Sequence, residues 1–232
     1  MDSIASALRL IFTWDPQLAV IVKLSLTVSI LSTLLAAVIG VPLAFAVAFN
    51  RFYGKRLFIM MINTLLSVPT VVIGLFVYAV IARRGPLGSL GLLYTPWAIV
   101  IGQVLLIVPL ITALTLAAVN RMDDRYRQTA RTLGANGRQV MWVVFKEARF
   151  GVVAALIAAF GRVISEIGIS MMLGGNIKGF TRTITTAMAL EYDKGAFTLA
   201  VALGVVLLVV SFSINLLFHF VQGRTGQEQL AP

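Results

Sequence analysis

Residues 97–119 read WAIVIGQVLLIVPLITALTLAAV, a run without a single charged side chain. A helix that crosses the hydrocarbon core of a bilayer needs about 20 predominantly apolar residues. This run is long enough to do so, and it predicts a transmembrane helix, which we place at residues 92–119. Lipid is therefore the expected solvent for this part of the chain.

Four further apolar segments meet the same length criterion, at 18–49, 57–82, 150–173 and 196–221. The composition agrees with them, because 59% of the 232 residues are hydrophobic and 12% are charged. Soluble domains are usually about 45–50% apolar and about 25% charged. The sequence predicts an all-α, polytopic membrane helix bundle of about five transmembrane helices, a single domain over residues 1–232 with its bundle at 18–221. Residues 4–12 are too short to span, and we expect them to lie at the membrane interface.

Several classes of function lose support from the residues that the chain lacks. It has no cysteine and one histidine, which excludes a thiolate metal site and argues against any metal site. The phosphate-loop pattern of nucleotide-binding proteins is absent, so we expect no cofactor in this chain. The net charge of +10 is explained by basic residues beside a membrane, and no nucleic-acid partner is expected.

The loops between the predicted spans differ in basic charge, and this difference predicts the orientation. One side holds Arg51, Lys55, Arg56, Arg121, Arg125, Arg127, Arg131, Arg138, Lys146, Arg149 and Arg224. The other side holds Arg9, Arg83, Arg84, Lys178, Arg182 and Lys194. Because cytoplasmic loops carry the excess of lysine and arginine, we expect the N-terminus outside and the C-terminus inside.

Three prolines, Pro42, Pro69 and Pro109, fall inside three different predicted spans. Each lacks a backbone N–H and is expected to kink or break its helix. In lipid the freed groups must be satisfied by protein or by water. The three prolines therefore favour a solvated pathway over the alternative that membrane helices simply tolerate proline.

The longest basic loop, residues 121–149, has the pattern of two short helices separated by a glycine. Asp123 or Asp124 can cap the first helix, and Gly134 can end it in a left-handed conformation. From the residues alone, a basic amphipathic loop resting on anionic lipid remains an alternative.

The fourth predicted span carries Arg162 and Glu166, spaced so that they can pair on one helix face. Ionised side chains within a membrane often mark a transport path, and the alternative is a purely structural ion pair. After this span comes an outer loop rich in glycine, with polar groups that are candidates to meet an oxyanion or a partner protein. They are Asn176, Lys178, Thr181, Arg182 and Thr183.

The 121–149 loop resembles the signature loop of permease subunits of ATP-binding-cassette (ABC) importers. The family pattern is Glu-Ala-Ala, three further residues and a glycine; here Gln128, Thr129 and Ala130 precede Gly134. The leading carboxylate is absent, and so is the later Leu-Pro, whose place is taken by Phe145 and Lys146. The segments 67–74, 84–88, 161–168 and 174–195 are similar to the molybdate/tungstate branch of this family, and most similar to its tungstate members.

This resemblance implies an importer of tungstate or molybdate in the cytoplasmic (inner) membrane of a prokaryote. It implies as partners a second copy of the chain, a cytoplasmic ATPase dimer that holds the ATP and Mg²⁺, and an extracytoplasmic oxyanion-binding protein, in addition to membrane lipid. The contacts with the ATPase would come from Arg127, Gln128, Thr129, Ala130, Arg131, Thr132, Leu133, Gly134 and Ala135.

Two other functions are weighed against the importer. An ATP-independent ion channel or facilitator fits the prolines and the ion pair equally well, but it leaves the docking loop unexplained. A membrane enzyme lacks a clustered set of acid and base groups in this sequence.

Overall fold

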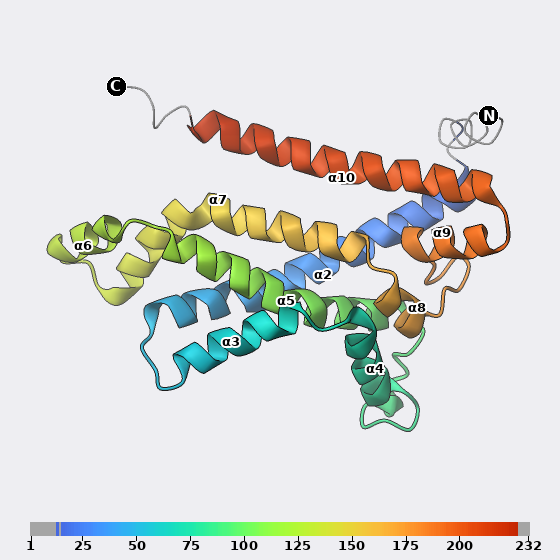
Figure 1. Cartoon of the computed structure of the whole chain (residues 1–232), viewed down its shortest axis with the longest axis horizontal. Helices are drawn as coiled ribbons and strands as arrows, with labels where there is room; N and C mark the ends of the chain where they lie inside the picture. Colours follow the sequence, from blue (N-terminus) through green and yellow to red (C-terminus); the bar gives the residue numbers. More distant parts are fainter. Residues whose placement is uncertain (1–12, 14, 227–232) are drawn as a thin grey trace.

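The computed structural model describes residues 13 and 15–226, with the side chains of 217–226 excepted. Within that part of the chain every long element is an α-helix (Figure 1). The long helices are α2 (Pro16–Phe49), α5 (Pro96–Asn120), α7 (Gly137–Ile164) and α10 (Phe197–Gly226). The shorter elements are α3 (Lys55–Leu66), α4 (Thr70–Ile81), the 3₁₀ turn η1 (Gly88–Leu90), α6 (Asp124–Thr132), α8 (Gly168–Gly174) and α9 (Ile184–Asp193). The interfacial segment expected at 4–12 lies outside the described residues.

α2 and α5 begin where the sequence supplies a cap. The Asp15 carboxylate accepts hydrogen bonds from the backbone N–H groups of Gln17 (2.8 Å) and Leu18 (3.2 Å), and Pro16 occupies the first turn. Thr95 caps α5 in the same way, ahead of Pro96. Both helices start with backbone donors satisfied and with proline where its missing N–H costs nothing.

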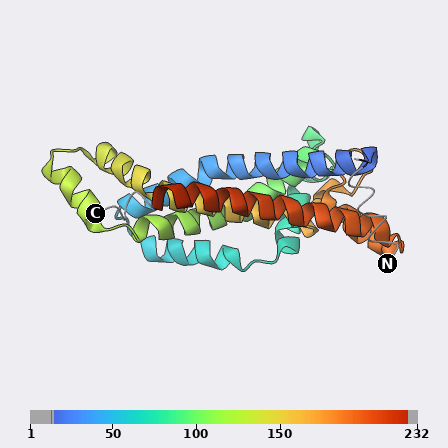
Figure 2. The ribbon, with the colours of Figure 1, turned by 90° about the horizontal axis from the view of Figure 1, so that it is seen from above.

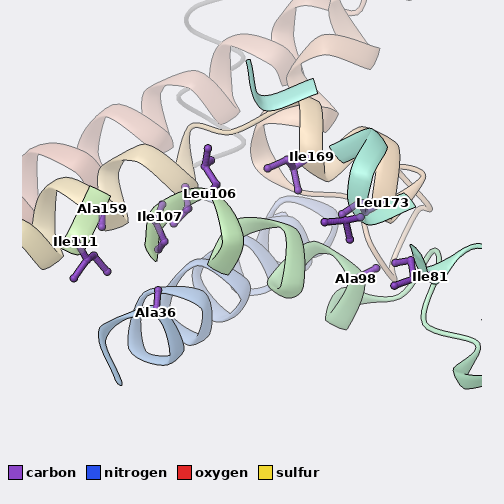
Figure 3. Packing of buried hydrophobic residues seen from close by; sticks show 11 residues of the cluster. Ala36, Ile81, Ala98, Leu106, Ile107, Ile111, Ala159, Ile169 and Leu173 are labelled. Atoms are coloured by element: carbon purple, nitrogen blue, oxygen red, sulfur yellow. The ribbon is translucent and has the colours of Figure 1, made fainter. Parts of the chain in front are cut away.

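α5 is the centre of the molecule, in contact with α2, α3, α4, α7 and α8. Its buried residues Leu106, Ile107 and Ile111 pack with Ala36 of α2 and with further residues of α4, α7 and α8 (Figure 3). α10 packs mainly against α9 and α7, shares a buried cluster with the start of α2, and runs along the outside of the bundle in Figure 1. In an apolar 18-residue stretch of each helix, 56% of α5 is buried but only 17% of α10. α10 therefore presents most of its apolar surface outward.

Two predicted spans prove to be bent pairs of helices. Residues 57–82 form α3 and α4, which meet at 99°, and residues 150–173 lie in α7 and α8, which meet at 59°. Among the described residues, three helices are therefore long and apolar enough to cross a membrane, or five if each bent pair is one span. The all-helical, multi-span fold is confirmed, and the break expected at Pro69 lies between α3 and α4.

The three prolines behave differently from one another. Pro69 caps the start of α4, so it lies at the break and not inside a helix. α2 and α5 continue without interruption through Pro42 and Pro109. Beside both of these prolines, the Thr112 hydroxyl lies 2.7 Å from the Val108 carbonyl oxygen and 3.3 Å from the Gly40 carbonyl oxygen.

The connecting loops gather at two opposite ends of the molecule (Figure 1). One end holds the turn between α2 and α3, together with α6 and the end of α10. The other end holds the start of α2, the segment between α4 and α5, and α9. The two groups of loops are the same two groups that the basic-charge pattern separates.

Candidate functional site

α6 stands apart at one end of the molecule, past the ends of the long helices (Figures 1 and 2). Asp123 is its cap, with the carboxylate accepting from Arg125 N at 2.9 Å. The helix ends at Thr132 with Leu133 as its C-terminal cap, and Gly134 follows with a φ of +82°, a conformation that favours glycine. Asn136 then opens α7 with a capping box, in which its side chain and that of Gln139 each bond the other's backbone N–H. The structure thus contains the two helices separated by a glycine that the sequence predicts.

The outer surface of α6 is formed by residues that the family resemblance predicts as contacts with the ATPase. Gln128, Thr129, Arg131, Thr132, Leu133 and Gly134 are all exposed, and we call them the docking surface. Leu133 is 82% exposed, a large apolar side chain with little cover from its own chain. A hollow of about 500 Å³ adjoins it, bordered by Tyr126, Thr129 and Val143 among others.

Two of the residues expected to touch the ATPase are largely covered by their own chain. Ala130 is only 7% exposed, because it packs inside the α6–α7 corner, where its carbonyl accepts from Ala135 N at 2.9 Å. The Arg127 guanidinium lies over the Phe49 ring of α2, 4.9 Å from its centroid. Both residues shape α6 from within, so we leave them out of the docking surface.

α6 is also linked to α7 through Tyr126. The negative charge of Glu147 on α7, and a hydrogen bond to it, raise the pKa of the Tyr126 phenol above its ordinary value. The phenol therefore stays protonated beside the Glu147 carboxylate.

Arg162 and Glu166 form an ion pair at the break between α7 and α8. Arg162 Nη1 lies 2.7 Å from Glu166 Oε2, and the two side chains are 42% and 4% exposed. The second carboxylate oxygen of Glu166 lies 3.4 Å from Ile169 N, at the start of α8. Thr185 Oγ1 donates to the Glu166 carbonyl oxygen at 2.9 Å. Glu166 therefore satisfies backbone groups freed by the break, as burial in a membrane requires.

The outer loop uses its threonines inwardly, which corrects the expectation for two of them. Thr181 is 0% exposed, and its hydroxyl donates to the Gly174 carbonyl and accepts from Ile177 N. Thr183 is 5% exposed and caps α9. Their hydroxyls replace backbone hydrogen bonds that the glycine-rich turn cannot make, so they cannot face an anion or a partner protein.

The remaining outer-loop residues differ in exposure. Lys178 is exposed, while Asn176 and Arg182 are half-buried. Asn176 Nδ2 donates to the Thr186 carbonyl (3.3 Å), and Arg182 Nη2 donates to the Asn176 carbonyl (3.4 Å). Lys178 is thus the one of the five predicted outer-loop residues whose side chain stands free of such contacts among the described residues.

Sequence reasoning missed the polar residues that join helices inside the bundle. Gln103 accepts from Ser32 Oγ at 2.9 Å and donates to the Val163 carbonyl at 3.2 Å. Ser25 Oγ accepts from Ile184 N at 2.7 Å, which holds the start of α9 against α2. A polar side chain within an otherwise apolar run was the available signal for both.

No ligating cluster is found among residues 13 and 15–226, where no three His, Cys, Asp or Glu side chains come together to hold a metal ion.

Comparison with known proteins identifies the family to which this chain is similar. The family described as "Binding-protein-dependent transport system inner membrane component" matches residues 36–227. The tungstate uptake system permease protein TupB of Peptoclostridium acidaminophilum is 39% identical over 95% of this chain and 97% of its own. A probable anion ABC transporter permease protein of Haloferax volcanii is 40% identical over 88% of this chain and 90% of its own.

The fold has solved counterparts as well. A chain of the MetNI methionine ABC transporter, in an inward-facing conformation, superposes with a TM-score of 0.72. It is 17% identical, and the match covers 90% of this chain and 95% of that one, so it speaks for the fold alone. This chain therefore belongs to the family of inner membrane components of binding-protein-dependent transport systems, the permease subunits of ABC transporters.

Proposed function

We propose that the chain is the permease subunit of an ATP-driven importer of tungstate or molybdate. The observation that carries the substrate is the near full-length similarity to TupB of Peptoclostridium acidaminophilum and to TupB of Campylobacter jejuni, which is 38% identical over 94% of this chain. A molybdenum transport permease of Haemophilus influenzae is 30% identical over 72% of this chain, which supports molybdate as the second candidate. These relatives favour an importer over a channel or facilitator.

The ATPase partner docks on α6 and carries both ATP and Mg²⁺. α6 is a short helix on a glycine hinge, with an exposed Leu133 at its tip and a hollow beside it. An exposed apolar side chain ringed by polar residues is the usual form of an anchor at a protein interface. This chain binds no nucleotide itself and is the membrane-embedded subunit whose helices move during transport.

The external binding protein delivers the anion at the opposite end of the molecule. Lys178 is exposed there, and Arg83 and Arg84 border a separate hollow of about 580 Å³. Basic side chains at this end attract an oxyanion and the acidic groups of a protein that carries one.

We place the ion pair of Arg162 and Glu166 on the transport path. Gln103 bonds both Ser32, near the middle of α2, and Val163, so the pair lies near mid-height in the bundle. An ionised group at the bilayer centre costs about 2.5–3.5 kcal/mol on insertion scales. The exposed guanidinium of Arg162 therefore faces water or a second copy of the chain and not lipid. Glu166 offsets its charge, which keeps the contact with a passing anion weak.

A second copy completes the permease. One chain presents the apolar flank of α10 and the exposed face of α7 outward, and two copies related by a two-fold axis can enclose a path between them. Lipid covers the remaining apolar surface.

Reconstitution tests the proposal directly. The chain is placed in proteoliposomes with its ATPase and its external binding protein, and the tungsten and molybdenum taken up are measured by mass spectrometry. We expect uptake against a gradient that requires ATP and the binding protein. Uptake that runs only downhill and continues without ATP would establish the channel instead. Calorimetry of the binding protein with tungstate, molybdate and sulfate then identifies the anion.

A further inference from the structure

We propose that Arg127 is the residue through which movement of α6 reaches α2, a positioning residue inside the chain and not a contact for the ATPase. This inference rests on the proposed function, in which α6 receives the ATPase. It concerns the next step, namely how a displacement of α6 enters the membrane helices.

The placement of Arg127 is unusual for a residue on an exposed helix. Its side chain is 26% exposed, its guanidinium lies over the Phe49 ring, and Nη1 is 3.8 Å from the Asp124 carboxylate. Its Nε is buried, and no acceptor among the described residues reaches it. A buried donor without a partner is costly, and a turn of the side chain toward water would relieve that cost. The contacts with Phe49 and Asp124 therefore hold Arg127 in place, and of these two residues only Phe49 lies outside α6.

Phe49 passes the contact into a packed block of aromatic rings. It stacks on Phe45 with centroids 6.2 Å apart, and Phe45 lies 5.6 Å from Phe145 of α7. Phe145 stacks in turn on Trp142 at 5.5 Å. Phe45 is 5% exposed and belongs to a buried cluster with residues of α5 and α7. Close-packed interiors transmit displacement and do not absorb it.

Phe49 is also the last residue of a long rigid element. α2 has 34 residues, which makes it about 50 Å long at 1.5 Å per residue. Near its other end, Ser25 holds the start of α9 through the bond to Ile184 N. A displacement of Phe49, at one end of α2, can therefore be carried along the helix to the region of Ser25, which supports the start of α9 in the outer loop.

α6 has a second connection, but it leads to a different helix. The charge of Glu147 on α7, the helix that follows α6 directly in the chain, acts on the Tyr126 phenol. Arg127 instead reaches a helix that ends 78 positions earlier in sequence, at Phe49. Among the described contacts, the one between Arg127 and Phe49 gives α6 a direct link to α2 in addition to its covalent link to α7, and movement that passes between elements requires such physical links.

The test separates coupling from docking. Arg127→Gln and Phe49→Leu remove the two halves of the contact, and Phe49→Trp keeps an aromatic ring as a matched control. Two quantities are measured: the affinity of the ATPase for the permease in nanodiscs, and the number of anions imported per ATP hydrolysed in proteoliposomes. We expect Arg127→Gln and Phe49→Leu to keep the affinity within about twofold and to lower the import ratio about tenfold, within the range of typical coupling.

The double variant and the control complete the expectation. Arg127→Gln with Phe49→Leu should be no worse than either change alone, because both remove one contact. Phe49→Trp should keep the import ratio. A normal ratio in Arg127→Gln would overturn the proposal, and so would a loss of ATPase affinity as large as that of Leu133→Asp. Arg127 lies near the surface, so its variant carries the test even if Phe49→Leu folds poorly.

Leu133→Asp also tells the two proposals apart. It places a charge at the centre of the docking surface and should abolish ATPase binding. If binding survives that change, the docking role of α6 is wrong, whatever Arg127 does.

Discussion

Arg162 and Glu166 form a charged pair inside a membrane helix, where burying a charge is unfavourable and the contacts of each side chain offset that cost. Glu166 is buried, and its carboxylate bonds Arg162 on one oxygen and approaches the start of α8 with the other. The i,i+4 spacing predicted this pair from sequence. The burial of Thr181 and Thr183 could not be predicted, because it depends on where α9 packs, and no local pattern contains that information.

Removing Arg162 alone should damage the protein more than removing both charges. Arg162→Met leaves a buried carboxylate without its partner; the loss is about 3–5 kcal/mol for a fully buried pair and smaller here, because Arg162 is 42% exposed. The double variant Arg162→Met with Glu166→Met leaves no stranded charge and should be the more stable of the two. Thermal unfolding of the purified permease, followed by fluorescence-detected size exclusion, measures both. Equal destabilisation by the single and double changes would contradict the pairing.

At the scale of elements, hydropathy predicts where the apolar helices begin and end in the sequence, and it does not predict their course in space. Hydropathy reports where a helix is apolar, so α2, α5 and α10 were found within a few residues of their observed bounds. The bend at Pro69 was expected because proline disrupts a helix, whereas hydropathy gives no sign of the bend at Glu166, which follows from tertiary packing around α5. α9 was missed because its helix is short and begins within a run of threonines, which have a low helix propensity.

The glycine hinge of α6 should be required for coupling. Gly134 has a φ of +82° and nothing within 4 Å of where a side chain would begin, so any effect of substitution comes from the backbone. A β-branched residue disfavours that conformation strongly. Gly134→Val should uncouple ATP hydrolysis from uptake and leave membrane insertion intact. Gly137→Ala, also in open space but at the start of α7, is the matched control. Full coupled uptake by Gly134→Val would contradict the role of the hinge.

Two glycines on α7 predict opposite effects of the same substitution. A Cβ at Gly151 would lie 2.5 Å from Ala118 Cβ on α5, while a Cβ at Gly161 meets nothing within 4 Å. Gly151→Ala forces the helices apart and should destabilise by about 1–3 kcal/mol, as overpacking does. Gly161→Ala should stabilise by about 0.5–1 kcal/mol, because alanine loses less backbone freedom in a helix. Unfolding midpoints of both variants that shift in the same direction would disprove the close approach of α5 and α7.

The whole molecule separates its loops into two groups, and the charge pattern assigns each group to one side of the membrane. The segments that share an end of the bundle are far apart in sequence, as α6 and the turn after α2 are, so their proximity depends on the number of crossings. With three full spans and two bent ones, the start of α2 and the end of α10 lie at opposite ends. The sequence predicted this parity by counting five spans, two of which are bent pairs of helices.

Single cysteines can determine the orientation, because the chain contains no cysteine of its own. Arg125 has a side chain that is 87% exposed at the α6 end, and Lys178 is exposed at the other end. In intact cells, a membrane-impermeant maleimide should label Lys178→Cys and should label Arg125→Cys only after the membrane is permeabilised. That result places the basic loops in the cytoplasm, where the positive-inside rule expects them. Labelling of Arg125→Cys from outside would reverse the orientation and remove the docking surface from the compartment that contains ATP.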